Sequence, residues 1–261
     1  MKTKIIAFVN NKGGSGKTTT CANVGYCLSC LGRKVLLIDG DMQMNLSLSF
    51  FGEDEVLAFA ESDKNLYEAV IKRDDLTDYI VSTSYENLDL IPSSGLMSQI
   101  EYELFSMEKR ETIFKEIISK VKSKGKYDYI LVDAPPTLGG WVMNILTATD
   151  EVVVPVEASP WGLFGIANMF DFLDKAAKSN KSLDVLGVAL TKVDARKNYY
   201  HQTLEILQDA DGVNVFENII RVDSSVEWAQ DNSMPIGAYK KSARSAIEYS
   251  ELAKEIDKLC Q

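Results

Sequence analysis

Short segments rich in apolar residues recur along this chain and predict strands, and the most continuous of them predict buried strands of a parallel sheet. They lie at residues 4–10, 34–39, 88–92, 127–133, 152–156, 185–190 and 214–220. Apolar residues three or four positions apart predict helices at 18–31, 66–71, 76–80, 98–122, 161–178 and 242–259. Because strands and helices alternate, we expect an α/β fold with a mostly parallel twisted sheet and helices on both faces.

The first and last of these helices have apolar stripes that should face the core. The stripes comprise Cys21, Val24, Leu28 and Leu31 in one helix, and Ile247, Leu252, Ile256 and Leu259 in the other. Residues 52–64 are acidic and show little periodicity, so they are expected to form a surface loop.

Composition indicates an ordinary globular protein. The chain has 261 residues, of which 46% are hydrophobic and 25% charged, and no Pro/Gly/Ser-rich linker divides it. We therefore expect residues 1–261 to form a single domain. No apolar run approaches the ~20 residues of a membrane span, and no signal peptide is evident. A cytoplasmic location without a membrane partner is expected.

Net charge and cysteine content narrow the classes of binding partner and metal site that this chain could have. The formal net charge of −10 argues against a protein coated with nucleic acid in every state, but it leaves room for a local basic face. Cys27 and Cys30 have the spacing of a metal or redox pair, yet no second pair completes a site. We interpret them as buried thiols that fill gaps beside a helix.

The richest chemical signal is the segment from Asn10 to Thr20, which lies between the first predicted strand and helix. A glycine-rich turn between a strand and a helix can direct successive N–H groups at a phosphate, helped by the positive end of the helix. Lys17 would reach the β- and γ-phosphates, and the Thr18 hydroxyl would ligate Mg²⁺. The loop residues expected to hold the nucleotide are Lys12, Gly13, Gly14, Ser15, Gly16, Lys17, Thr18 and Thr19.

This loop departs from the ordinary P-loop pattern at its start. Asn11 replaces the first glycine, and a second lysine, Lys12, directly precedes the glycine pair. A lysine at the entrance of the loop is poorly placed to serve the same phosphate as Lys17. Its natural use is to neutralise phosphate charge across a dimer interface.

Acidic residues end two of the predicted strands. Asp39 and Asp41 follow the run at 34–39, and Asp133 ends the run at 127–133. Ligands of open α/β sheets gather at the carboxyl ends of strands, so these carboxylates should face the phosphates. Asp133 has the position of a Walker B acid that holds Mg²⁺ through a water. The Pro/Gly-rich segment 134–140 after it is typical of a nucleotide-sensing switch.

These motifs together resemble the ParA/MinD family of ATPases, whose deviant Walker A box reads Lys-Gly-Gly-x-Gly-Lys-Thr-Thr. The resemblance covers nearly the whole chain and is closest to the small ParA/Soj partition proteins. It implies ATP and Mg²⁺ as cofactors and an ATP-bound homodimer in which Lys12 enters the partner's site. It also implies that Lys12, Lys17 and Asp41 are catalytic, with Asp41 orienting the attacking water. Thr18, Asp39 and Asp133 would support the metal, although Asp39 could instead cap a turn.

The same resemblance suggests contacts outside the phosphate loop. Thr191, Arg221 and Asp223 occupy the positions of the family's adenine-side loops. The ATP dimer of small ParA proteins binds DNA nonspecifically through basic residues. The candidates here are Arg196, Lys197, Lys240, Lys241 and Arg244, while Ser225 stands where Soj-like members often carry an arginine.

We therefore expect a slow, switch-like partition or positioning ATPase associated with the nucleoid, whose hydrolysis a ParB-like adaptor stimulates. The alternative is an ATPase scaffold or regulator that positions proteins without binding DNA. A metabolic P-loop kinase is a third hypothesis, but no arginine-rich lid is visible in the sequence.

Overall fold

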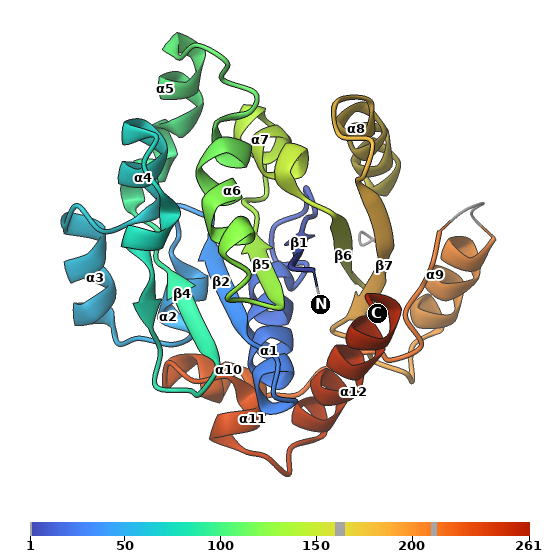
Figure 1. The fold of residues 1–261 in the computed structure, drawn as a ribbon. Helices are drawn as coiled ribbons and strands as arrows, with labels where there is room; N and C mark the ends of the chain where they lie inside the picture. Colours follow the sequence, from blue (N-terminus) through green and yellow to red (C-terminus); the bar gives the residue numbers. More distant parts are fainter. Residues whose placement is uncertain (1, 160–164, 210–212) are drawn as a thin grey trace.

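The computed structural model describes residues 2–159, 165–209 and 213–261. Its centre is one seven-stranded sheet with the order β3-β4-β2-β5-β1-β6-β7 (Figure 1). All neighbouring strands run parallel except β3, which is antiparallel to β4. The strands are β1 Lys4–Phe8, β2 Val35–Asp39, β3 Val81–Ser82, β4 Leu88–Ile91, β5 Tyr129–Asp133, β6 Glu151–Glu157 and β7 Asp184–Thr191.

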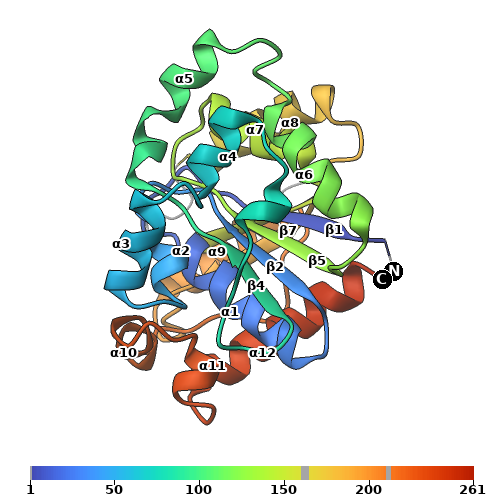
Figure 2. The ribbon, with the colours of Figure 1, turned by 60° about the vertical axis from the view of Figure 1, so that its left-hand side comes forward.

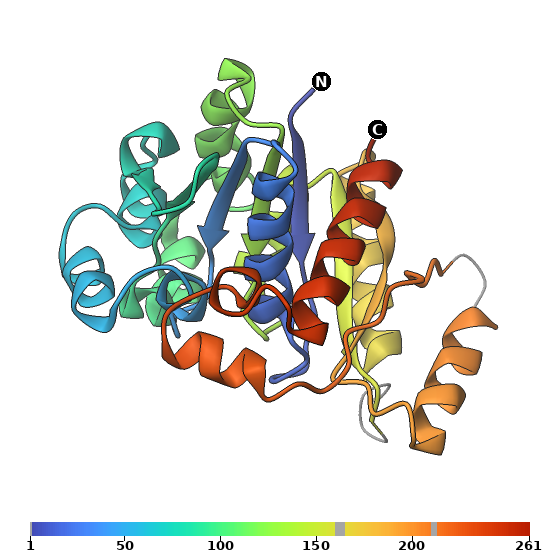
Figure 3. The ribbon, with the colours of Figure 1, turned by 90° about the horizontal axis from the view of Figure 1, so that it is seen from below.

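Helices cover both faces of the sheet, as the sequence predicts (Figure 2). One face carries α4 Leu66–Lys72, α5 Ile100–Ser106, α6 Ile113–Lys124, α7 Gly140–Ala148 and α8 Ile166–Ser179, with the short 3₁₀ helices η1 Leu76–Tyr79 and η2 Gly95–Gln99. The other carries α1 Lys17–Cys30 and α12 Arg244–Leu259 side by side (Figure 3), with α2 Asn45–Leu48, α3 Glu53–Glu61, α10 Ser225–Asp231 and α11 Ile236–Tyr239. Helix α9 Asn198–Gln208 lies beyond the β7 edge.

Two hydrophobic clusters fill the space between the sheet and these layers. Successive side chains of a strand point to opposite faces, so Ile5 and Ala7 of β1 belong to one cluster, and Ile6 and Phe8 to the other. The central strands are therefore apolar along most of their length, which is why they appear as apolar runs in the sequence. Among the described residues, no helix combines the length and the apolar character needed to cross a membrane.

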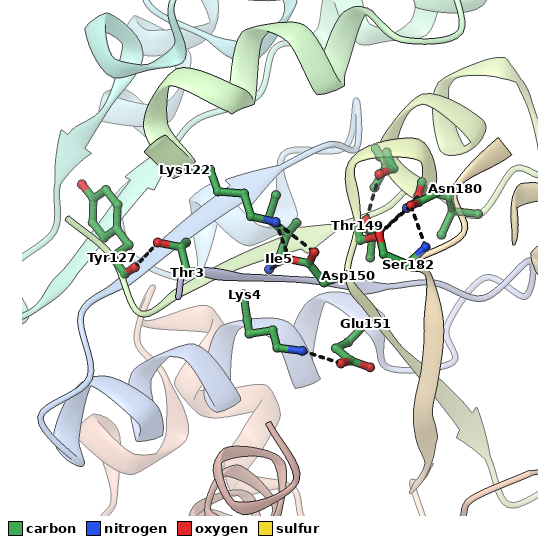
Figure 4. Close-up of polar contacts among 12 residues, drawn as sticks. Thr3, Lys4, Ile5, Lys122, Tyr127, Thr149, Asp150, Glu151, Asn180 and Ser182 are labelled. Carbon is green, nitrogen blue, oxygen red and sulfur yellow. Dashed lines mark hydrogen bonds and ion pairs between the residues drawn. The ribbon is translucent and has the colours of Figure 1, made fainter. Parts of the chain in front are cut away.

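Polar contacts tie the elements together at the amino ends of the strands (Figure 4). The Asp150 carboxylate accepts hydrogen bonds from the Ile5 backbone N–H at 2.9 Å and from Lys122 Nζ at 2.7 Å. Lys4 forms an ion pair with Glu151 at 2.8 Å. These contacts hold β1, β6 and α6 in register at the end of the sheet opposite the phosphate loop.

Three predicted elements take other forms. Residues 53–61 form helix α3 rather than a loop, because acidic residues in its first turn suit the helix dipole and Val56 packs into the core. The predicted helix 98–122 is interrupted between α5 and α6. There, the carbonyls of Arg110 and Glu111 accept hydrogen bonds from side chains of α7 instead of from the following turn.

The predicted strand 214–220 is also wrong. Within this segment Val215 forms an isolated bridge to Val188 of β7, and a few backbone hydrogen bonds join the two, but no ladder forms because the N–H groups of Glu217 and Asn218 bond to the Glu255 carboxylate instead. Three members of the predicted core, Leu31, Ile247 and Leu259, are exposed, and so is Cys30, whereas Cys27 is buried. The start of the predicted helix 161–178 lies partly outside the described residues, and α8 begins at Ile166.

Candidate functional site

The order of the strands brings the three signature segments together. Strand β5 lies between β2 and β1, and Asp39 pairs in register with Asp133. The phosphate loop follows β1, whose Phe8 also pairs with Asp133. The loop and both acids therefore meet at the carboxyl ends of three adjacent strands, where open α/β sheets place their ligands.

The phosphate loop depends on two residues with left-handed backbone. Gly14 has φ of +74° and Gly16 has φ of +86°, a region that strains a residue with a Cβ. The Thr191 hydroxyl at the end of β7 donates a 2.8 Å hydrogen bond to the Ser15 carbonyl oxygen. The structure thus places Thr191 beneath the loop, where it holds the loop's backbone in its curl.

Lys17 lies inside this curl. It is only 6% exposed, and its Nζ lies 3.3 Å from the Lys12 carbonyl oxygen. Burial lowers the pKa of Lys17, while the negative charges of Asp133 and Asp41 act in the opposite direction. Lys17 also lines the cavity in front of the loop, where the sequence predicts that the phosphates bind.

Asp133 is fully buried, and neither of its carboxylate oxygens has a well-aligned hydrogen-bond partner among the described residues, although the Thr18 side chain lies close enough to act on its pKa. Burial raises its pKa, and the nearby Asp39 charge adds to this, while Thr18 and Lys17 oppose it. Buried carboxylates without partners are rare, because they lose their hydration without compensation. These two oxygens beside the phosphate loop fit a hydrated Mg²⁺, an ion that prefers oxygen ligands.

Asp39 is equally buried but has partners of its own. One oxygen accepts bonds from the Ser47 N–H at 2.8 Å and the Ser47 hydroxyl at 2.7 Å, and the other accepts from the Asp41 N–H at 3.3 Å. Burial raises its pKa to about 6, although the bonds from Ser47 counteract the shift. The side chain therefore fixes the turn into α2, the alternative role that the sequence left open.

Asp41 lines the cavity in front of the loop and is 8% exposed. Its Oδ1 accepts a bond from the Gln43 N–H at 3.1 Å. The preceding Gly40 packs directly against β5, since a Cβ there would lie 2.7 Å from the Asp133 carbonyl oxygen. Its own carbonyl oxygen accepts a 3.0 Å bond from the Trp141 indole N–H of α7.

The second lysine of the loop takes a different direction from Lys17. Lys12 Nζ forms a 2.8 Å ion pair with Glu157 at the end of β6 and lies 3.4 Å from the Ser159 hydroxyl. Asn10 fixes the loop entrance, because its amide donates to the Pro155 carbonyl at 2.6 Å and its Oδ1 accepts from the Lys12 N–H at 2.9 Å.

A cavity of about 710 Å³ extends from the loop toward α10 and α12. Of the predicted nucleotide contacts, it is lined by Gly13, Gly14, Gly16, Lys17, Thr18, Thr19, Thr191, Arg221 and Asp223. Arg221 is held by an ion pair with Glu248. Burial favours a higher pKa for Asp223, but hydrogen bonds from Ser225 and Ser245 outweigh it and lower the pKa to about 2. Asp223 thus fixes the start of α12 at the cavity wall.

The basic residues predicted to contact DNA are all exposed, but they differ in their surroundings. The Arg196 guanidinium is held by Asp194 at 2.9 Å, and Arg244 donates to the Val222 carbonyl oxygen. Lys197, Lys240 and Lys241 form no ion pair within the described part of the chain.

The sequence analysis gave no individual role to four further residues at the site: Asn10, Trp141, Lys192 and Gln230. Lys192 lines the cavity, and its Nζ lies 4.0 Å from the position of a Cβ on Gly14. Gln230 of α10 donates to the Thr19 hydroxyl at 3.0 Å. Only the position of Asn10, directly between a strand and the loop, carries a signal in the sequence.

Comparison with known proteins agrees with this geometry. A family model described as "AAA domain" matches residues 3–185. The sporulation initiation inhibitor protein Soj of Bacillus subtilis is 37% identical over 254 residues, which cover 97% of this chain and 98% of Soj. The chain belongs to the ParA/Soj family of partition ATPases.

Solved structures extend the likeness of this ParA/Soj protein to the nucleotide. A cobyrinic acid a,c-diamide synthase from Mycobacterium smegmatis, with bound ATP analogue and magnesium, has a TM-score of 0.83 at 26% identity and covers 97% of this chain and 93% of its own. A plasmid partition protein from Borrelia burgdorferi bound to AMPPNP has a TM-score of 0.79 at 25% identity, with 99% and 98% covered. ATP and Mg²⁺ are accordingly the cofactors, and the protein is an ATPase of the partition or positioning type.

Proposed function

We propose that this protein is a nucleotide-switched partition ATPase whose ATP-bound form is a homodimer. The observation that carries the proposal is the opposite placement of two lysines from one loop. Lys17 is enclosed in the curl of the phosphate loop, whereas Lys12 lies outside it on Glu157. A cation outside the loop is available to the phosphates of a second copy, and Glu157 holds it until that copy binds.

The residues around the loop suit phosphoryl transfer, which needs charge neutralisation and an aligned water more than covalent help. Lys17 and the loop amides neutralise charge from within the subunit, and Lys12 does so from the partner. Asp41, at the cavity wall, orients the attacking water. Thr18 and Asp133 would hold Mg²⁺, which would neutralise phosphate charge, and Asp39 would support them by fixing the turn into α2.

Such a site hydrolyses ATP slowly until a partner completes it, because the chain's own Lys12 is paired with Glu157. We propose that a ParB-like adaptor stimulates hydrolysis and thereby releases the dimer from nonspecific DNA. The exposed lysines Lys197, Lys240 and Lys241 support a DNA-binding face, since paired copies would follow phosphates without reading bases. A cytoplasmic, nucleoid-associated protein would result.

The experiment that tests this function compares DNA retention by the Asp41→Ala variant with ATP and with ADP, at ~50 mM salt where phosphate contacts are strong. The variant should still bind ATP and form the dimer but should not hydrolyse ATP. DNA should therefore be retained with ATP and not with ADP. Lys17→Ala is the matched control, because it removes nucleotide binding and should retain no DNA in either case.

The alternative, a scaffold that positions proteins without DNA, is favoured by the pairing of Arg196 with Asp194 and by the net charge of −10. A trapped ATP dimer that ignores DNA would establish it. Equal loss of ATP binding in Asp41→Ala and Lys17→Ala would instead refute the separate roles of these two residues.

A further inference from the structure

The start of helix α7 is capped by a residue from a distant part of the chain. The Glu101 carboxylate of α5 accepts hydrogen bonds from the Gly140 N–H and the Trp141 N–H, both at 2.9 Å. The first N–H groups of a helix have no partner within the helix, and a carboxylate also suits its positive end. Gly139, at the capping position, has no side chain to provide this contact itself.

The two glycines before Trp141 leave room for this carboxylate. A Cβ on Gly139 would collide with Glu101 Oε1, and a Cβ on Gly140 would lie 3.0 Å from Oε2. These glycines therefore have a second reason to be small, beside the flexibility expected of a switch segment. They allow the Glu101 carboxylate to approach the backbone at the end of segment 134–140, which follows Asp133.

From the capped end of α7, one further contact reaches the turn formed by Asp39, Gly40 and Asp41. The Trp141 side chain is 1% exposed and packs edge-on against Phe114, with ring centroids 5.4 Å apart. Its indole N–H donates to the Gly40 carbonyl oxygen at 3.0 Å. Gly40 lies between Asp39 and Asp41, so the position of the indole sets the peptide next to Asp41.

We infer that Glu101 is a positioning residue for hydrolysis, acting on Asp41 through the start of α7 and the Trp141 indole. Without the carboxylate, the first turn of α7 loses two hydrogen-bond acceptors, and Trp141 no longer has a fixed backbone. The Gly40 carbonyl then loses a well-aimed donor, and the Asp41 carboxylate is less often aligned. The inference rests on the proposed role of Asp41, and it places the control of turnover at a solvent-exposed side chain on α5.

The test is steady-state ATP hydrolysis by the full-length chain carrying Glu101→Ala, Glu101→Gln or the matched control Glu103→Ala. Glu103 lies on the same helix and forms no hydrogen bond or ion pair through its carboxylate among the described residues. Because misalignment of a reacting group lowers the rate without weakening substrate binding, kcat should fall at least about fivefold in Glu101→Ala. Glu101→Gln, which keeps one acceptor oxygen, should be intermediate, and Glu103→Ala should match the unchanged protein.

Affinity for ATP separates positioning from general damage, and it should stay within about twofold in every variant. A fall in kcat and affinity together, or a Glu101→Ala variant as active as Glu103→Ala, would overturn the inference. Trp141→Phe provides a second measurement. If both residues act along one path, the double variant Glu101→Ala/Trp141→Phe should be no less active than the less active of the two single variants.

Failure of the proposed function is recognised separately through Asp41→Ala. If that variant still hydrolyses ATP, the role given to Asp41 is wrong. If Asp41→Ala is inactive while Glu101→Ala is fully active, only the positioning role of Glu101 fails.

Discussion

Removing one hydroxyl beneath the phosphate loop should weaken ATP binding without disturbing the fold. Thr191→Val keeps the shape of the side chain but removes the donor that holds the Ser15 carbonyl at 2.8 Å. Thr191 is 2% exposed and Ser15 is 1% exposed, so water cannot easily replace the lost bond. Leaving a buried carbonyl without a partner costs about 1–3 kcal/mol.

This cost falls on the loop that must present its amides to the phosphates. If all of it appears in binding, the dissociation constant for ATP rises roughly fivefold to a hundredfold, since about 1.4 kcal/mol is a factor of ten. Isothermal titration calorimetry with ATP and Mg²⁺ would measure the change. Thr191→Ser, which keeps the hydroxyl but loses the methyl group beside Gly16, is the matched control and should bind almost normally. A valine variant that binds ATP as tightly as the serine variant would refute the reasoning.

Three further predictions concern charged residues. Lys12→Ala should change the free energy of unfolding by less than about 1 kcal/mol, because its pair with Glu157 is partly exposed, yet it should abolish the ATP-dependent rise in mass seen by light scattering. Lys192→Ala should weaken ATP binding several-fold without changing the thermal midpoint, because this exposed cation beside the loop makes no ion pair within the described residues. Burial alone would raise the pKa of Asp257, but hydrogen bonds from Arg33 and Tyr129 outweigh it and lower the pKa. Asp257→Asn should therefore lose about 1–3 kcal/mol of stability in urea at pH 7, and the difference should shrink as the pH falls below about 4.

Each of these has an outcome that would count against it. ATP dimers of normal mass in Lys12→Ala would remove the role of that lysine in the partner's site. Unchanged ATP affinity in Lys192→Ala would show that its closeness to Gly14 has no effect on the phosphates. A stability difference for Asp257→Asn that persists at low pH would mean that the carboxylate charge does not cause it.

Some features of this protein depend only on neighbouring residues, and the sequence alone determined them. The glycines and Lys17 form the phosphate loop because backbone freedom and side-chain reach are local properties. Apolar runs ending in Asp39 and Asp133 predicted buried strands with acids at their carboxyl ends. The helix at 53–61 was missed because its apolar contacts are few and its acidic residues resemble those of a loop.

Other features required the tertiary structure, because their partners are far apart in the chain. The register that places Asp39 beside Asp133 follows from the strand order, and Thr191 reaches a carbonyl 176 positions away. The segment 214–220 contains the strand-forming residues Val215, Phe216, Ile219 and Ile220, but a carboxylate from α12 competes for its backbone N–H groups. Local preference sets which structures a segment can adopt. Hydrogen bonds between distant segments then decide which of those structures forms, because they satisfy some backbone donors and acceptors and leave others free to pair. These bonds exist only in the folded chain.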